Sequence, residues 1–210
     1  MENQEQHLKD LQEIRSMMER SSRFISLSGL SGVCAGVFAL VGAALVYIKP
    51  ENQLDYVAYY MQRSNGVEFR IFLFIDALAV LAASLLGGYF FTARKARRDG
   101  LPMYDATAKR LLFGLEVPLV TGGLFCLILL YYNLLGLIPA SMLIFYGLGL
   151  LNGSKFTLPE IGYLGICQII LGLVSALYIG YGLFFWAFGF GVLHIVYGVV
   201  MYLRYERNED

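Results

Sequence analysis

Residues 71–93 read IFLFIDALAVLAASLLGGYFFTA, and the sequence RKARR follows directly at 94–98. A helix of about 20 consecutive apolar residues crosses a hydrocarbon core roughly 30 Å thick. Basic residues gather on the cytoplasmic side of membrane proteins. This stretch therefore predicts a transmembrane helix whose C-terminal end lies inside the cell.

Five further segments have the same length and apolar character. They are residues 24–48, 111–132, 134–151, 161–181 and 183–203. Hydrophobic residues make up 58% of the 210 residues and charged residues only 15%, which is far from the composition of a soluble domain. The sequence therefore predicts an all-α protein, a polytopic six-helix transmembrane bundle that occupies residues 24–205.

The distribution of charge predicts the orientation of the bundle. If the N-terminus lies in the cytoplasm, only Lys49, Arg63 and Arg70 of the 16 Lys and Arg residues lie outside. Such an excess of basic residues on one side is typical of the cytoplasmic side. We therefore expect both termini to be cytoplasmic, with a short tail at 206–210, in the inner membrane of a bacterium.

Two other cytoplasmic segments differ in character. Residues 1–23 place Leu8, Leu11 and Met18 at helical spacing among charged residues, which predicts a short amphipathic helix. This helix would dock either on the inner membrane surface or on a partner protein. The basic residues 94–110 would attract anionic membrane lipid. They lack the interleaved aromatic residues and reader motifs of a nucleic-acid-binding segment, so no direct contact with nucleic acid is expected.

Two five-residue segments within the last four predicted spans have similar sequences, and we call them the echoed segments. Residues 144–148 read IFYGL and residues 195–199 read IVYGV, and a fainter match links Gly29, Gly114 and Gly165. Repeats are common in transporter folds, whereas glycine-rich apolar sequence also produces chance matches. Repeated helical hairpins and coincidence therefore both stay open.

Four polar side chains interrupt the predicted spans: Asp76, Glu116, Gln168 and His194. Such groups are costly in hydrocarbon, usually face the interior of a bundle and often mark function. At about 1.5 Å per residue, Asp76 lies near the outer boundary, Glu116 near the inner boundary and the other two near the middle. They would form a staircase across the membrane if they faced a common interior.

Two interpretations of this staircase are open. Histidine titrates near neutral pH, so His194 and the two carboxylates could pass protons in a small transporter or channel. Alternatively, each residue is an interhelical hydrogen-bond anchor worth about 0.6–2 kcal/mol. Small residues share the faces of Gln168 and His194, which favours helix packing there. Pro118 also frees a backbone carbonyl that needs another partner.

The sequence lacks the usual signals of catalysis. It contains no HExxH, GxSxG or Ser/Lys protease pattern, and its second histidine, His7, belongs to the polar N-terminus. Cys34, Cys126 and Cys167 lie inside spans without CxxC spacing, so we expect buried core cysteines rather than a disulfide framework or a zinc site. The sequence therefore predicts no enzyme, no catalytic residue, no metal site and no cofactor.

Three segments resemble a family of uncharacterised six-span integral membrane proteins from Bacteroidota. They are residues 17–32, residues 118–126 (PLVTGGLFC) and residues 189–198 (GFGVLHIVYG). The resemblance covers nearly the whole chain and implies the same six-span fold. Family members look as if they are often encoded beside a small winged-helix regulator, which implies a cytoplasmic signalling partner. No activity is assigned to the family, so the resemblance transfers no catalytic residue.

The expected function is that of a scaffold or signalling component that recruits a cytoplasmic regulatory protein. The alternative is a small proton-coupled transporter or channel that uses Asp76, Glu116 and His194. Glycine-rich seams suit helix packing within one chain as well as between chains, so an oligomer also stays open.

Overall fold

Long helices account for most of residues 27–48, 67–100 and 104–207, which are the residues that the computed structural model describes. The first five long helices are α2 (Gly29–Ile48), α4 (Val67–Arg98), α5 (Ala106–Tyr131), α6 (Ile138–Gly153) and α7 (Pro159–Leu177). The sixth span, Ile179–Tyr205, is composite. It consists of the turn η4 (Ile179–Tyr181), α8 (Gly182–Trp186), η5 (Ala187–Leu193) and α9 (His194–Tyr205).

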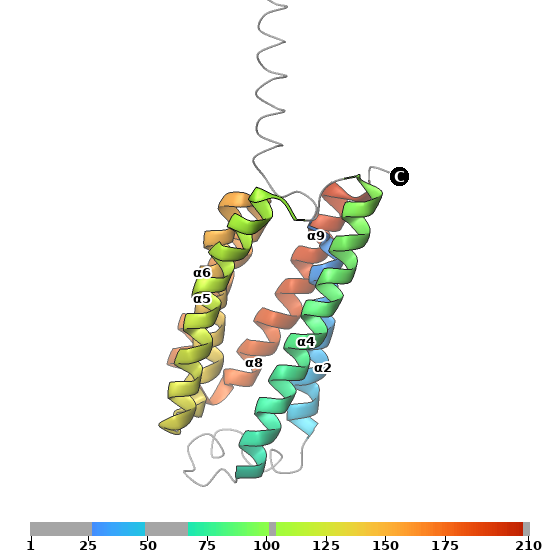
Figure 1. Cartoon of the computed structure of the whole chain (residues 1–210). Helices are drawn as coiled ribbons and strands as arrows, with labels where there is room; N and C mark the ends of the chain where they lie inside the picture. Colours follow the sequence, from blue (N-terminus) through green and yellow to red (C-terminus); the bar gives the residue numbers. More distant parts are fainter. Residues whose placement is uncertain (1–26, 49–66, 101–103, 208–210) are drawn as a thin grey trace, which may run out of the picture.

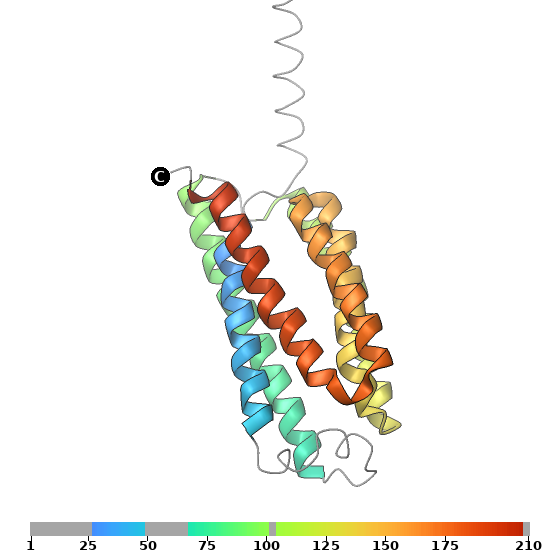
Figure 2. The same cartoon turned by 180° about the vertical axis from the view of Figure 1, so that it is seen from behind.

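The predicted six-helix bundle is confirmed. Among the described residues, six helices are long and apolar enough to cross a membrane, and they run side by side (Figures 1 and 2). Large apolar side chains remain exposed along them, including Leu86 (71%) and Phe113 (69%), as expected for surfaces that face lipid. The predicted amphipathic helix 1–23 lies outside the described residues. Of the predicted tail, only residues 206 and 207 are described.

Two helices extend beyond their predicted bounds at the same end of the bundle. α4 continues through the RKARR segment, where basic residues in the last turn suit the negative end of the helix dipole. α5 begins at Ala106 rather than at residue 111, because the Asp105 carboxylate caps it and accepts the Ala108 N–H at 2.6 Å. The helices therefore extend past the apolar segments that hydropathy detects.

The helices are arranged as a bent row rather than a closed ring. α4 packs on α2, and α2 packs on the sixth span. The sixth span contacts α7, α7 packs on α6, and α6 packs on α5. Figure 1 shows the result, with α4 and α5 at the two ends of the row and the sixth span behind them. Each end helix thus has one principal neighbour and exposes most of its circumference.

Glycines allow α6 and α7 to approach closely. A Cβ atom built on Gly147 would lie 2.6 Å from the carbonyl oxygen of Gly165. A Cβ atom built on Gly172, two turns after Gly165 on α7, would lie 2.9 Å from the carbonyl oxygen of Ala140. Real side chains do not tolerate such distances, so these glycines set the separation of the two backbones.

Glycines bring the sixth span close to α2 in the same way. A Cβ atom on Gly198 would lie 2.7 Å from the carbonyl oxygen of Gly29, and one on Gly36 would lie 2.6 Å from that of Gly191. Gly198 follows Tyr197 as Gly147 follows Tyr146 in the echoed segments. The echo therefore corresponds to one type of helix contact that the chain uses twice.

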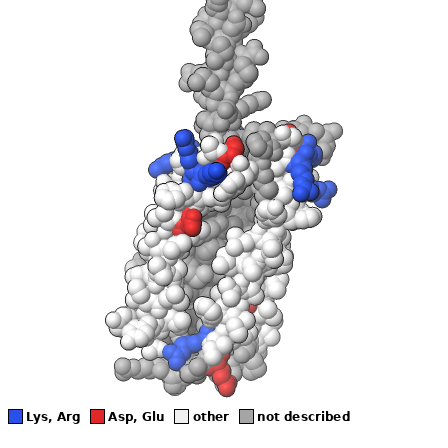
Figure 3. Space-filling model, viewed as in Figure 1, with Lys and Arg blue, Asp and Glu red and all other residues white. Residues whose placement is uncertain are grey.

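The basic residues mark one end of the bundle, which we call the basic end. Of the ten Lys and Arg residues in the described part of the chain, all but Arg70 lie there (Figure 3). The chain is tied together at this end. The Glu206 carboxylate accepts the Ser28 hydroxyl at 3.1 Å and the Gly29 N–H at 2.5 Å, and Lys95 donates to the Leu27 carbonyl at 3.2 Å. These bonds join the start of α2 to the ends of α4 and α9.

A second tie at the basic end joins α7 to α9. The buried Glu160 accepts hydrogen bonds from the Arg204 guanidinium at 2.7 Å and from the Tyr205 hydroxyl at 2.9 Å. Hydrogen bonds to a charged group are among the stronger ones in proteins. The ends of α2, α4, α7 and α9 are therefore held in fixed positions at this surface.

Pro118 interrupts the hydrogen bonds of α5 without ending the helix. Proline has no N–H, so the carbonyl of Gly114, four residues earlier, loses its helical partner. The amide of Asn152 on α6 donates to this carbonyl at 3.0 Å. The freed carbonyl thus finds the additional partner that the sequence requires, and the bond also joins α5 to α6.

We predict that Asn152→Ala lowers the free energy of unfolding by about 1 kcal/mol, because it leaves the Gly114 carbonyl unpaired. In a Pro118→Ala background the loss should be clearly smaller, since this substitution restores the missing backbone N–H. Unfolding in mixed detergent is measured for the wild type, the two single variants and the double variant, and it gives the coupling free energy between positions 152 and 118. Lys155→Ala is the control, because Lys155 also contacts Asn152, at 3.2 Å. Equal losses in both backgrounds would contradict this role.

Candidate functional site

The sixth span contains a π-helix at its centre. η5 occupies Ala187–Leu193, with the sequence AFGFGVL, between two α-helical segments. A π-helix is wider than an α-helix, occurs mostly as a single turn and is frequent at functional sites. The span predicted at residues 183–203 is present within Ile179–Tyr205, but the sequence did not predict this π-helical segment. The two glycines, Gly189 and Gly191, are the only local signal of the irregularity.

The π-helix directs a backbone carbonyl toward polar side chains. The carbonyl oxygen of Gly189 accepts a hydrogen bond from Nε2 of Gln168 at 2.8 Å and lies 3.0 Å from Nδ1 of His194. Gln168 is fully buried on α7, and His194 is 6% exposed. Spacing placed each of these residues on a small-residue face expected to pack on other helices, and the two side chains meet at one oxygen.

A third helix completes this cluster. The hydroxyl of Tyr146 on α6 lies 2.7 Å from Nε2 of His194. Because a carbonyl only accepts, His194 donates from Nδ1 to Gly189. In a neutral imidazole Nε2 then accepts the Tyr146 hydroxyl, so both ring nitrogens are bonded. We call Tyr146, Gln168, Gly189 and His194 the buried polar cluster.

Aromatic rings enclose the imidazole. Phe190 stacks on His194 with ring centroids 5.9 Å apart and an interplanar angle of 15°. Tyr146 lies 5.3 Å from His194 and 5.0 Å from Phe190, and Trp186 lies 5.2 Å from Phe190. The rings occupy the space around the histidine, so the buried polar cluster is a packed contact among three helices.

Two buried oxygens in this region have no hydrogen bond to any described residue. They are Oε1 of Gln168 and Oγ of Ser175, which lies two turns further along α7. Leaving a polar group unpaired in an apolar environment costs roughly 1–3 kcal/mol. Gln168 is thus oriented by its donor alone, toward the Gly189 carbonyl.

Asp76 does not join the buried polar cluster. It lies on α4 against Gly42 of α2, where a built Cβ atom would be 3.2 Å from Oδ2 of Asp76. His194 meets α2 at Gly32, ten residues away from Gly42, which is a rise of about 15 Å. Arg70, the basic residue nearest to Asp76 in the sequence, donates to Asn133 at 2.7 Å. Within the described part of the chain, Asp76 makes no hydrogen bond or ion pair.

Glu116 faces away from the bundle. It is exposed on α5, whose neighbour α6 contacts the opposite side of the helix through Gly114 and Gly122. The staircase required all four polar residues to face a common interior, and Glu116 does not meet that condition. Of the four, only Gln168 and His194 come together, so they do not form a continuous staircase.

The three cysteines are free, as the spacing predicted, but they are half-buried rather than fully buried. Cys34 packs at the contact between α2 and Gly87 of α4, and Cys167 lies 3.7 Å from the Tyr197 hydroxyl. Among the described residues, no group of three His, Cys, Asp or Glu side chains is placed to hold a metal ion.

Comparison with protein-family models, with curated proteins and with solved structures returns no match. The resemblance to a Bacteroidota membrane family therefore stays a prediction.

The sequence did not predict two of these contacts. Tyr146 stood out only within the echoed segment IFYGL, and Asn152 was not identified as the donor to the Gly114 carbonyl. Their partners lie 48 and 38 residues away along the chain, so no local pattern pairs them. The one signal for Asn152 was Pro118, which required a donor without identifying it.

Tyr146→Phe and His194→Leu should show a coupling free energy of about 0.6–1.7 kcal/mol in a double-mutant cycle, because each change removes the same hydrogen bond. Unfolding in mixed detergent provides the measurement. Tyr197→Phe is the matched control, since Tyr197 occupies the equivalent position of the echoed segment and its hydroxyl lies 3.7 Å from Sγ of Cys167. Strictly additive losses for Tyr146 and His194 would contradict the bond.

Gly189→Ala should destabilise the protein by roughly 1–3 kcal/mol, because a Cβ atom there would overlap Leu143 and lie 2.6 Å from Oε1 of Gln168. Gly123→Ala, also inside a membrane-spanning helix, has no neighbouring atom within 4 Å and should be neutral or mildly stabilising. Thermal unfolding in detergent compares the two variants. A stable Gly189→Ala protein would show that the cluster is loosely packed.

Proposed function

We propose that this chain is an integral-membrane scaffold or signalling component without enzymatic activity. It recruits a cytoplasmic regulatory protein at its basic end. The observation that carries this proposal is that both nitrogens of the only histidine in the spans are occupied by hydrogen bonds within a packed helix contact. A side chain used in this way stabilises the bundle.

The basic end supports the second half of the proposal. The starts and ends of four helices are tied together there by Glu206, Lys95 and Glu160. The chain enters this surface at Leu27, next to the end of α4 and the end of α9. A rigid, basic surface with a polar N-terminal segment attached to it suits the docking of a soluble protein.

The alternative is a proton-coupled transporter or channel that uses Asp76, Glu116 and His194. Proton transfer needs groups that are linked by hydrogen bonds or by water. Asp76 lies between α2 and α4, His194 between α6, α7 and the sixth span, and Glu116 on the exposed side of α5. The separation of these three side chains favours the scaffold function over a proton-coupled transporter or channel.

We expect a photocrosslinker at Arg97, on the basic end, to capture one specific partner in cells. Deletion of residues 1–20 should abolish capture while the bundle retains its unfolding temperature. A crosslinker at Tyr131, which is 81% exposed at the opposite end, is the matched control. Equal capture from both ends, or none from Arg97, would contradict recruitment at the basic end.

Proteoliposomes that contain the purified protein test the alternative directly. Proton entry under an imposed pH gradient, followed with an internal pH-sensitive dye, should equal that of empty liposomes. Protein-dependent flux that His194→Ala or Glu116→Gln abolishes would reverse the choice between the two functions.

A further inference from the structure

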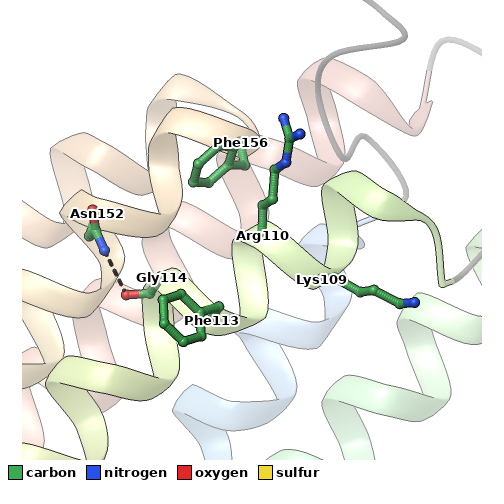
Figure 4. Close-up of a pocket in the computed structure, with 6 residues that line it drawn as sticks. All are labelled: Lys109, Arg110, Phe113, Gly114, Asn152 and Phe156. Atoms are coloured by element: carbon green, nitrogen blue, oxygen red, sulfur yellow. Dashed lines mark hydrogen bonds between the residues drawn. The ribbon is translucent and has the colours of Figure 1, made fainter.

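A pocket opens on α5 close to the basic end of the bundle. Its volume is about 390 Å³, and its lining residues are Lys109, Arg110, Phe113, Gly114, Asn152 and Phe156 (Figure 4). We propose that this pocket binds the headgroup of an anionic phospholipid, with the phosphate at Arg110 and an acyl chain along α5. The Lys109 side chain points away from Arg110 and adds positive charge beside the pocket (Figure 4). The proposal does not rest on the recruitment of a partner protein.

The cations of the pocket are available for an anion. Arg110 is exposed and makes no hydrogen bond or ion pair with any described residue. The ammonium group of Lys109 lies 5.2 Å from the centre of the Tyr104 ring, a weak contact that leaves its charge unneutralised. Arginine binds phosphate through parallel N–H donors, which makes Arg110 the principal contact.

Among the residues that the structure describes, no carboxylate lines the pocket to neutralise these cations. Asp105 is occupied as the cap of α5, where it accepts the Ala108 N–H. Glu116 lies six residues beyond Arg110, which is about 9 Å deeper along the helix. Lys155 donates to Oδ1 of Asn152 at 3.2 Å and so brings a third positive charge to the rim. The first turn of α5 adds the positive end of the helix dipole.

The apolar part of the pocket continues into the membrane. Phe113 lies one turn deeper than the two cations and is 69% exposed. Val117, Val120 and Leu124 continue the same face of α5 and are 50–58% exposed. Positive charge at headgroup depth, followed by an apolar strip along the helix, matches the two halves of a phospholipid. Basic pockets beside transmembrane helices on the cytoplasmic side bind such headgroups.

The structure also explains why the pocket keeps its shape. Its floor is the segment around Gly114, whose carbonyl is held by Asn152 (Figure 4). Gly114 is needed there, because a Cβ atom would lie 3.3 Å from the Asn152 amide. The bond that compensates for Pro118 therefore fixes α5 against α6 beneath the two cations.

Native mass spectrometry of the full chain in detergent, with equal amounts of phosphatidylglycerol and phosphatidylcholine, tests the proposal. We expect phosphatidylglycerol adducts to dominate, and Arg110→Gln to reduce their retention by about fivefold, the equivalent of roughly 1 kcal/mol. Because Arg110 is exposed and bonds no described residue, this variant should unfold at the wild-type temperature in phosphatidylcholine.

Arg97→Gln is the matched control, since Arg97 is an exposed basic residue at the same end on α4 and does not line the pocket. Its phosphatidylglycerol adducts should equal those of the wild type. Equal losses for the Arg110 and Arg97 variants would overturn the site in favour of general charge attraction. Equal binding of the two lipids would also overturn it. Displacement of the lipid by inorganic phosphate or glycerol phosphate would assign the pocket to a soluble anion instead.

Discussion

A backbone carbonyl inside a membrane has no water to bond, and the polar architecture of this bundle follows from that constraint. Pro118 leaves the carbonyl of Gly114 without a donor, and Asn152 supplies one from α6. The π-helix presents the carbonyl of Gly189, and Gln168 and His194 bond to it. In both places a side chain replaces a backbone donor. Asn152, Gln168 and His194 are thereby committed to joining helices.

These bonds depend on how closely the helices approach. Gly147 and Gly165 bring α6 onto α7, and Gly198 and Gly29 bring the sixth span onto α2. The buried polar cluster takes one residue from α6, one from α7 and two from the sixth span. It therefore forms only when the contact between Gly147 and Gly165 holds α6 against α7. Small residues at helix contacts let backbones pack where no hydrophobic effect drives association. Packing and polar bonding therefore support each other.

The sequence predicted the helices better than the site. Apolar segments located all six spans, and helical spacing correctly placed Gln168 and His194 on packed faces. The sequence left open whether Glu116 faces inward, and it does not, because α5 is an end helix with one principal neighbour and most of its surface is exposed. Tyr146 was not singled out, because tyrosine in a span is common and its hydroxyl gives no signal until a partner is in place. The π-helix was missed because glycines at 189 and 191 do not distinguish it from a regular helix.

The sequence by itself determined the number and positions of the spans and the gathering of basic residues at one end. Both depend on local properties, namely about 20 consecutive apolar residues and the charges that flank them. Only the tertiary structure decided which polar side chains meet and which face lipid. Those pairings depend on contacts between segments far apart in the chain, such as Gly29 with Gly198. No periodicity within one helix specifies which neighbour it will have or at what register the two will pack.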